Sequence, residues 1–100
     1  NIYPAEVESA IYGHPAVADV AVIGVPDERW GEAVKAMVVL RPGVAADVDG
    51  ILGWARERIA GFKVPKSIDF IDAMPRNPAG KLLRRALREP YWVGCSRRVN

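Results

Sequence analysis

A loop in this chain combines one lysine with residues that restrict the backbone around it. The loop reads Met74-Pro75-Arg76-Asn77-Pro78-Ala79-Gly80-Lys81, and Leu82-Leu83-Arg84-Arg85 follows it. Two prolines and a glycine within six positions exclude a helix, because proline fixes φ and lacks an N–H, while glycine tolerates positive φ. Lys81 is therefore predicted at the lip of a stiff loop. A lysine carries a compact charge on a flexible stem, which suits the stabilisation of an anionic transition state.

The loop is not a nucleotide-binding P-loop. That motif needs a glycine five residues before Gly80 and a Ser or Thr after the lysine, where this chain has Pro75 and Leu82. Taken alone, the stretch is more simply interpreted as a solvated lysine at the start of a helix.

The composition indicates one small globular domain. The chain has 100 residues, of which 50% are hydrophobic and 26% charged, and this argues against disorder. No apolar run approaches the length of a membrane span, and no signal-peptide pattern is present. The single cysteine, Cys95, cannot form an internal disulfide, which favours a reducing, cytoplasmic setting.

Charge is distributed unevenly along the chain. Residues 1–75 hold seven Lys/Arg against eleven Asp/Glu, whereas residues 76–100 hold seven against one. A basic end could bind nucleic acid, and the simpler alternative is a solvated helix face. Arg76, Arg84 and Arg85 are interpreted as residues that set the local field and solubility.

Hydrophobic periodicity and turn residues predict an α+β fold in the order α-β-β-α-β-α. Its small sheet of about three strands packs with about three helices. Asp47 is a predicted helix N-cap, Gly61 follows the second helix, and Glu89-Pro90 is expected to end the third. The domain is expected to occupy residues 1–90, with a loosely ordered tail at 91–100. The expected helices are 4–12, 48–60 and 81–88, and the expected strands are 17–25, 33–40 and 66–71.

The lysine loop resembles the C-terminal lysine motif of acyl-adenylate-forming enzymes, which include acyl-CoA synthetases. That motif reads Pro-Lys/Arg-Asn/Thr-x-x-Gly-Lys-x-x-Arg. Three further segments are similar to the same superfamily in the same order, so the resemblance covers roughly residues 1–90. The matching motif residues are Pro75, Arg76, Asn77, Gly80, Lys81 and Arg84, and the further segments are Asn1 to Glu8, His14 to Gly31 and Phe62 to Lys66.

The resemblance, closest to fatty-acid-CoA ligases, implies the mobile C-terminal domain of a larger enzyme. Such enzymes join a carboxylic acid to ATP, giving an acyl-adenylate, and then pass the acyl group to CoA. ATP and CoA are therefore the implied substrates. The N-terminal adenylation domain is the implied partner and the expected location of Mg²⁺. This chain by itself is expected to be inactive, with the interdomain hinge upstream of Asn1.

The resemblance also assigns roles by position. Lys81 would contact the substrate carboxylate and the α-phosphate or ribose oxygens during adenylation, and a lysine acetyltransferase could modify it. Trp30, Phe62 and Lys66 match positions that contact the CoA nucleotide in some ligases. Val64 departs from at least one ligase, which has arginine there. No metal ligand is implied in this chain.

Two other functions stay open. One is the C-terminal part of an adenylation enzyme that loads a carrier protein; the aromatic residue at position 30 and the Phe-Lys turn favour CoA instead. The other, from a different class, is a small basic nucleic-acid-binding module, whose affinity would fall steeply with salt. The absence of repeats and low-complexity segments gives that module no further support.

Overall fold

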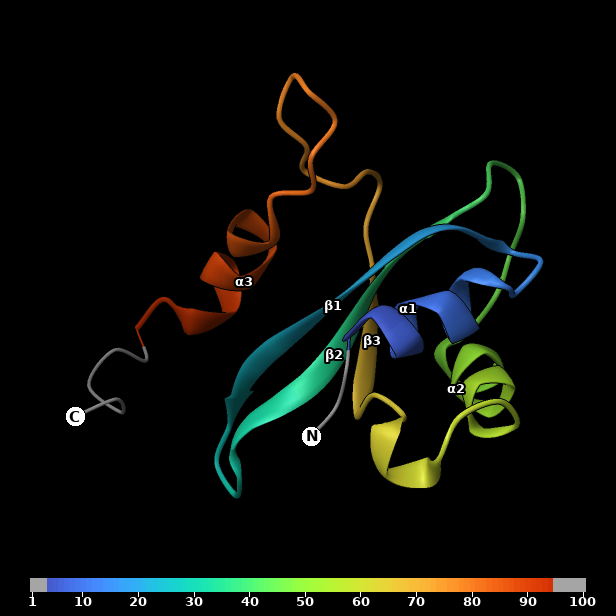
Figure 1. Cartoon of the computed structure of the whole chain (residues 1–100), viewed down its shortest axis with the longest axis horizontal. Helices are drawn as coiled ribbons and strands as arrows, with labels where there is room; N and C mark the ends of the chain where they lie inside the picture. Colours follow the sequence, from blue (N-terminus) through green and yellow to red (C-terminus); the bar gives the residue numbers. More distant parts are fainter. Residues whose placement is uncertain (1–3, 95–100) are drawn as a thin grey trace.

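The computed structural model describes residues 4–94. A three-stranded sheet lies at its centre, with strands in the order β1-β2-β3. Helices α1 and α2 lie on one side of this sheet and α3 on the other (Figure 1). The element order confirms the predicted α-β-β-α-β-α fold. The elements are α1 (Pro4–Tyr12), β1 (Val17–Asp27), β2 (Gly31–Leu40), α2 (Val48–Arg56), the 3₁₀ helix η1 (Gly61–Lys63), β3 (Ser67–Phe70) and α3 (Arg84–Trp92).

The sheet is mixed. β1 and β2 form an antiparallel pair, in which Val22 lies opposite Ala36. Gly31 follows the connecting turn with φ of 81°, a conformation that L side chains rarely adopt. β3 joins the other side of β2 in parallel, with Ile68 opposite Ala36. A parallel partner needs a crossover connection, and the segment that contains α2 and η1 supplies it.

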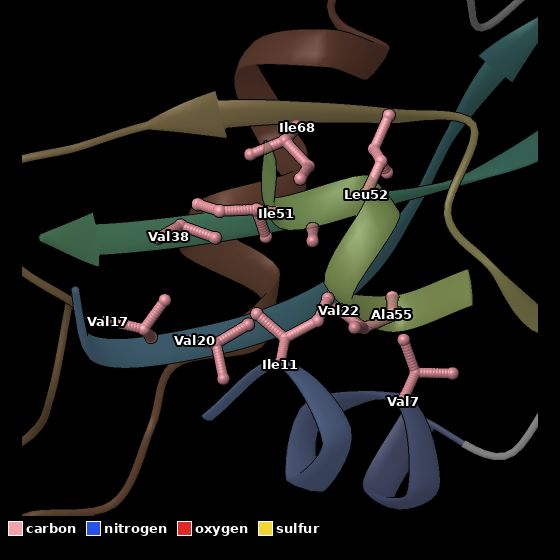
Figure 2. Close-up of a cluster of buried hydrophobic side chains, with 11 residues drawn as sticks. Val7, Ile11, Val17, Val20, Val22, Val38, Ile51, Leu52, Ala55 and Ile68 are labelled. Atoms are coloured by element: carbon pink, nitrogen blue, oxygen red, sulfur yellow. The ribbon is translucent and has the colours of Figure 1, made fainter. Parts of the chain in front are cut away.

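Strand alternation divides the core into two layers. On one face, Val22 and Val38 pack against Ile11 of α1 and Ile51 of α2, all within one buried cluster (Figure 2). On the other face, α3 inserts Leu87 into a smaller cluster. Successive strand residues point to opposite faces, so the small and β-branched residues of β1 supply both layers. The smaller cluster contains Ala21, Ile23, Val25, Met37 and Leu87.

The second helix ends earlier than the predicted 48–60. Asp47 caps α2 as predicted, accepting a hydrogen bond from the Gly50 N–H at 2.7 Å. After Arg56 the backbone tightens, because the N–H groups of Arg58 and Ile59 both donate to the Ala55 carbonyl, at 2.9 and 3.0 Å. Sharing one carbonyl in this way closes a helix.

The prediction for the third helix, 81–88 with an end at Pro90, was wrong. Residues 81 and 82 pair back across the loop instead, so the helix starts at Arg84. It also continues through Pro90, since the Val93 N–H still donates to the Glu89 carbonyl at 3.1 Å. Proline removes one backbone donor from the helix, and Trp92 joins this last turn to β1 by donating its indole N–H to the Gly24 carbonyl at 2.8 Å.

The first residues of the expected tail, 91–100, are helical. Tyr91 and Trp92 belong to α3 and contact the sheet. Two stretches lie outside the described residues. They are residues 95–100, which include Cys95, and residues 1–3, with which the first family-like segment begins. The domain boundary at residue 90 stays a prediction. No helix within residues 4–94 has the length and apolar character to cross a membrane.

Candidate functional site

The lysine loop, residues 75–82, folds back on itself. The Asn77 N–H donates to the Lys81 carbonyl at 3.0 Å, and the Leu83 N–H donates to the Pro75 carbonyl at 2.8 Å. A β-bridge joins Arg76 to Leu82 within this narrow hairpin. Gly80 near the tip has φ of 88°, which explains the glycine in the motif. The loop (orange) projects beyond the end of the sheet (Figure 1).

Lys81 has a fixed backbone and an exposed side chain. Its N–H donates to the Asn77 Oδ1 at 2.9 Å, while its carbonyl accepts from the Asn77 N–H. The side chain is exposed, and among residues 4–94 no carboxylate lies within ion-pair distance of its Nζ. The arrangement presents a cation that is available to an external anion.

Arg76 connects the loop to the sheet, contrary to its interpretation as a solubility residue. One guanidinium nitrogen donates to the Gly80 carbonyl at 2.9 Å and another to the Asp19 carboxylate at 2.8 Å. Asp19 lies on β1 and also accepts from the Val20 N–H at 2.9 Å. The sequence contained no signal for this contact, because 57 positions separate Arg76 from Asp19.

Arg84 also has a structural role that the sequence interpretation missed. It donates to the Glu8 carboxylate and to the Val22 carbonyl, both at 2.7 Å. The same Glu8 oxygen accepts from the Val22 N–H at 2.8 Å. These contacts join α1, β1 and the start of α3, which explains an arginine at the end of the lysine motif. The Arg85 side chain is exposed and makes no hydrogen bond or ion pair with any other residue between 4 and 94, and its assignment as a solvated charge stays a prediction.

Three sequence-predicted residues meet in one groove at the other end of the sheet. Trp30, Phe62 and Lys66 lie around a shallow hollow of about 230 Å³, hereafter the aromatic groove. Both aromatic side chains are 69% exposed, which is unusual for residues of their size. The remaining lining consists of Glu32, Ala33, Val34 and Val64.

Local backbone contacts hold the aromatic groove. The Trp30 N–H donates to the Asp27 carboxylate at 2.8 Å, which shapes the turn between β1 and β2. Phe62 lies on η1, and the Lys66 N–H donates to the Val34 carbonyl at 2.9 Å. The neighbouring Lys63 pairs with Glu6 at 2.8 Å. Lys66 is therefore the exposed lysine of the groove.

The lysine loop and the aromatic groove are far apart. Arg76 ties the loop to Asp19, whereas groove residue Ala33 pairs with Val25 of the same strand. Asp19 and Val25 are six positions apart on the strand, so the distance between them along β1 is about 20 Å. Figure 1 shows the loop at one end of the sheet and the turn between β1 and β2 at the other. The structure thus brings together three of the predicted site residues and separates Lys81 from them.

A partly buried polar cluster lies under α3. Lys35, which is 9% exposed, pairs with Asp69 at 3.1 Å, and the Tyr91 hydroxyl donates to the same carboxylate. The hydrogen bond from Tyr91 holds the pKa of Asp69 below its ordinary value. Desolvation by burial acts in the opposite direction, and Lys35 lowers the pKa further. Burial, followed by the Asp69 contact, raises the pKa of Tyr91 to about 12. The cluster joins α3 to the sheet.

The described residues offer no metal site. No group of three or more His, Cys, Asp or Glu side chains within residues 4–94 could hold a metal ion. His14 accepts from the Ala16 N–H at 3.0 Å and packs edge-on against Trp54, with 5.0 Å between ring centroids. These contacts give His14 a structural role.

Comparison with known proteins gives one consistent result. Residues 6–81 match the family described as the AMP-binding enzyme C-terminal domain. A fatty acid–[acyl-carrier-protein] ligase of Streptomyces coeruleorubidus is 48% identical over 100 residues, covering 100% of this chain and 19% of that protein. A feruloyl-CoA synthase of an Amycolatopsis species is 53% identical over 91 residues, covering 91% of this chain and 18% of that protein.

A solved structure shares the fold. A Mycobacterium tuberculosis fatty acyl CoA synthetase aligns with a TM-score of 0.85 and 47% identity, covering 94% of this chain and 18% of that one. The chain therefore spans less than a fifth of the length of these relatives.

Proposed function

Since this chain belongs to the AMP-binding enzyme C-terminal domain family, we propose that it serves as the mobile C-terminal domain of an ATP-dependent acyl-CoA synthetase. The membership confirms the resemblance carried by the lysine motif. The proposed enzyme converts a carboxylate and ATP to acyl-AMP and pyrophosphate, and then acyl-AMP and CoA to acyl-CoA and AMP. The observation that carries the proposal is Lys81, whose backbone is hydrogen-bonded on both sides while its side chain stays free for an anion.

In the first half-reaction, Lys81 acts between two anions. The substrate carboxylate must approach the α-phosphate of ATP, and their repulsion raises the barrier. A cation held between them offsets that repulsion most where the new bond forms. The single exposed lysine of this loop contributes little binding energy of its own, about 1 kcal/mol or less. This domain therefore needs an N-terminal adenylation domain, which supplies most of the grip on ATP.

In the second half-reaction, the aromatic groove receives part of CoA. The exposed rings of Trp30 and Phe62 offer faces on which an adenine can stack, with Val34 and Val64 behind them. Lys66 supplies a cation for a phosphate. Glu32 also lines the groove, so the phosphates are expected on the Lys66 side.

The first test uses Lys81→Ala in the intact enzyme, with each half-reaction assayed separately. Acyl-adenylate formation is expected to fall by orders of magnitude, whereas thioester formation from pre-made acyl-adenylate should remain. Lys66→Ala is the matched control, because it also removes one exposed lysine charge but lies in the groove. Equal loss of both half-reactions in Lys81→Ala would contradict the assigned role.

The groove is tested by Trp30→Ala, Phe62→Ala and Lys66→Ala. Each should raise the KM for CoA several-fold, since each removes one stacking or phosphate contact worth about 1 kcal/mol. Adenylate formation should stay near its original rate. Unchanged CoA kinetics in all three variants would exclude this groove as the CoA surface.

A carrier protein is the second candidate acceptor. The Streptomyces coeruleorubidus relative, named a fatty acid–[acyl-carrier-protein] ligase, matches over 100% of this chain. A carrier protein presents the thiol on phosphopantetheine, without the CoA nucleotide. The groove variants should then leave acyl transfer unchanged, so the same three substitutions distinguish the two acceptors.

Three further parts of the proposal concern Mg²⁺, acetylation of Lys81 and the location of the enzyme. Mg²⁺ is expected on the N-terminal domain, with ATP, since the described residues present no metal-binding cluster. A lysine acetyltransferase could reach the exposed Lys81, and acetylation would remove the charge that adenylation needs. The enzyme is expected in the cytoplasm.

The nucleic-acid-binding alternative is weaker, because Arg76 and Arg84 are engaged by Asp19 and Glu8.

A further inference from the structure

We propose that Asn77, Arg76 and Asp19 form a clamp that positions Lys81 for adenylation. The inference rests on the proposed role of Lys81 and assigns these three residues a role in the reaction without contact to substrate. They are positioning residues.

The clamp grips the peptide plane that precedes Lys81 from both sides. The N–H of this plane belongs to Lys81 and donates to the Asn77 Oδ1 at 2.9 Å. Its carbonyl belongs to Gly80 and accepts from Arg76 at 2.9 Å. Two adjacent side chains thus hold the donor and the acceptor of one peptide unit. Fixing this plane restricts the direction in which the Lys81 side chain leaves the backbone.

Asn77 closes the loop with its side chain as well as its backbone. The same Oδ1 also accepts from the Ala79 N–H at 3.0 Å, and the Asn77 carbonyl accepts from the Gly80 N–H at 2.8 Å. Both partners of the carboxamide are N–H donors, so the oxygen must face the loop. Alanine at this position would leave two backbone N–H groups without their acceptor.

Arg76 and Asp19 connect this part of the loop to the sheet. Asp19 accepts from Arg76 through one carboxylate oxygen and from the Val20 N–H of β1 through the other. A continuous series of hydrogen bonds therefore runs from the β1 backbone through Asp19 and Arg76 to the Gly80 carbonyl. Lysine at position 76 has no planar fork and could not reproduce both contacts in the same geometry.

The clamp is too exposed to be explained by fold stability. The Arg76 and Asp19 side chains are 43% and 32% exposed, and ion pairs with such access to water contribute little to folding. Position matters more than binding energy for a catalytic group, because a displacement of about 1 Å can reduce a rate about a hundredfold. Loss of the clamp should therefore affect the reaction far more than the melting temperature.

The test compares Asn77→Ala, Asn77→Thr and Arg76→Lys in the intact enzyme. Asn77→Ala should lower kcat for acyl-adenylate formation about tenfold to a hundredfold, with the KM for ATP changed less than twofold. Thioester formation from pre-made acyl-adenylate should be unchanged. Asn77→Thr should recover most of the rate, because a hydroxyl oxygen can accept one of the two N–H bonds. Arg76→Lys should fall between Asn77→Ala and the unaltered enzyme.

A second readout is independent of catalysis. Amide hydrogen exchange at Lys81 should accelerate about tenfold in Asn77→Ala, as expected for loss of a net hydrogen bond. Asp47→Ala is the control: it removes the same kind of side-chain cap, on the Gly50 N–H of α2. That variant should lower the melting temperature more than Asn77→Ala, with wild-type adenylation and Lys81 exchange.

The outcomes separate the two proposals. If Lys81→Ala leaves adenylation intact, the proposed function fails and the clamp has nothing to position. If Lys81→Ala abolishes adenylation but Asn77→Ala and Arg76→Lys retain the wild-type kcat, the clamp alone is refuted. Faster exchange at Lys81 with a wild-type kcat would also overturn it, because the backbone would be loosened without a catalytic consequence.

Discussion

Tyr91 makes the attachment of α3 sensitive to alkaline pH. Its hydroxyl donates to Asp69, which also pairs with the buried Lys35. Burial and the contact with Asp69 raise the pKa of Tyr91 from 10.0 to about 12. The folded state therefore holds this proton more tightly than the unfolded state. The resulting stability is complete below pH 10 and is lost as pH rises towards 12.

We expect a late-titrating phenol in the folded protein. The difference in phenolate absorbance between the unaltered chain and Tyr91→Phe should rise near pH 12. The pH dependence of unfolding between pH 10 and 12 should weaken in Tyr91→Phe, because phenylalanine has no phenol that can lose a proton in this range. A difference spectrum with its midpoint near pH 10 would show that neither burial nor Asp69 raises the pKa of Tyr91.

Arg84 satisfies backbone groups on the outer edge of β1. In the described sheet β1 pairs only with β2, and an open edge invites pairing with other chains. Glu8 accepts from the Val22 N–H and Arg84 donates to the Val22 carbonyl. Further along, Trp92 donates to the Gly24 carbonyl, and Pro26 has no N–H to satisfy. The lysine motif thus ends in a residue that closes the edge.

Arg84→Met should therefore destabilise the fold by about 1–2 kcal/mol, because Glu8 and Val22 lose a charged donor. It should also increase aggregation on heating. Chemical denaturation and light scattering measure the two effects. Arg85→Met, one position away on the exposed side of α3, is the matched control and should change neither. Equal stability of the two variants would argue against the edge contact.

At the scale of elements, α2 contains two glycines in different surroundings. A Cβ at Gly53 would meet nothing within 4 Å, whereas a Cβ at Gly50 would lie 2.9 Å from the Asp47 Oδ1 that caps the helix. Glycine inside a helix costs about 1 kcal/mol relative to alanine. Only at Gly53 can that cost be recovered without disturbing the cap.

Gly53→Ala should accordingly raise the free energy of unfolding by about 0.5–1 kcal/mol. Gly50→Ala should gain less or lose stability, since its methyl group competes with the Asp47 hydrogen bond. Thermal melts of the two variants compare the positions directly. A larger gain at Gly50 would mean that the cap tolerates the methyl group.

At the scale of the whole molecule, the two proposed sites occupy opposite ends of one sheet. About 20 Å of strand separates the attachment of the lysine loop from the aromatic groove. The groove is proposed to hold the CoA nucleotide and Lys81 to act on the acyl-adenylate, so the two ends serve different parts of the reaction. This arrangement is compatible with the mobile domain that the family resemblance implies.

The double variant Lys81→Ala, Phe62→Ala tests this independence in the intact enzyme. The loss in adenylate formation should equal that of Lys81→Ala, and the rise in the KM for CoA should equal that of Phe62→Ala. Sites this far apart are expected to be additive within about 0.5 kcal/mol. Strong coupling between the substitutions would contradict the independence of the two sites.

The sequence by itself determined the element order, most element positions and the motif that identifies the family. These are local properties: proline and glycine exclude helix at residues 75–80, and runs of small and β-branched residues mark the strands around Val22 and Val38. Asp47 could be read as a cap because its hydrogen-bond partner lies three residues away.

The tertiary structure decided where α3 begins and ends, and what the arginines contact. Arg84 reaches Glu8 across 76 positions and Trp92 reaches Gly24 across 68. Such partners leave no periodic trace in the chain, because periodicity records the face that a residue occupies and not its neighbour across that face. Distant contacts also explain why α3 continues past Pro90. The contacts of Tyr91 and Trp92 with the sheet outweigh the local cost of one missing hydrogen bond.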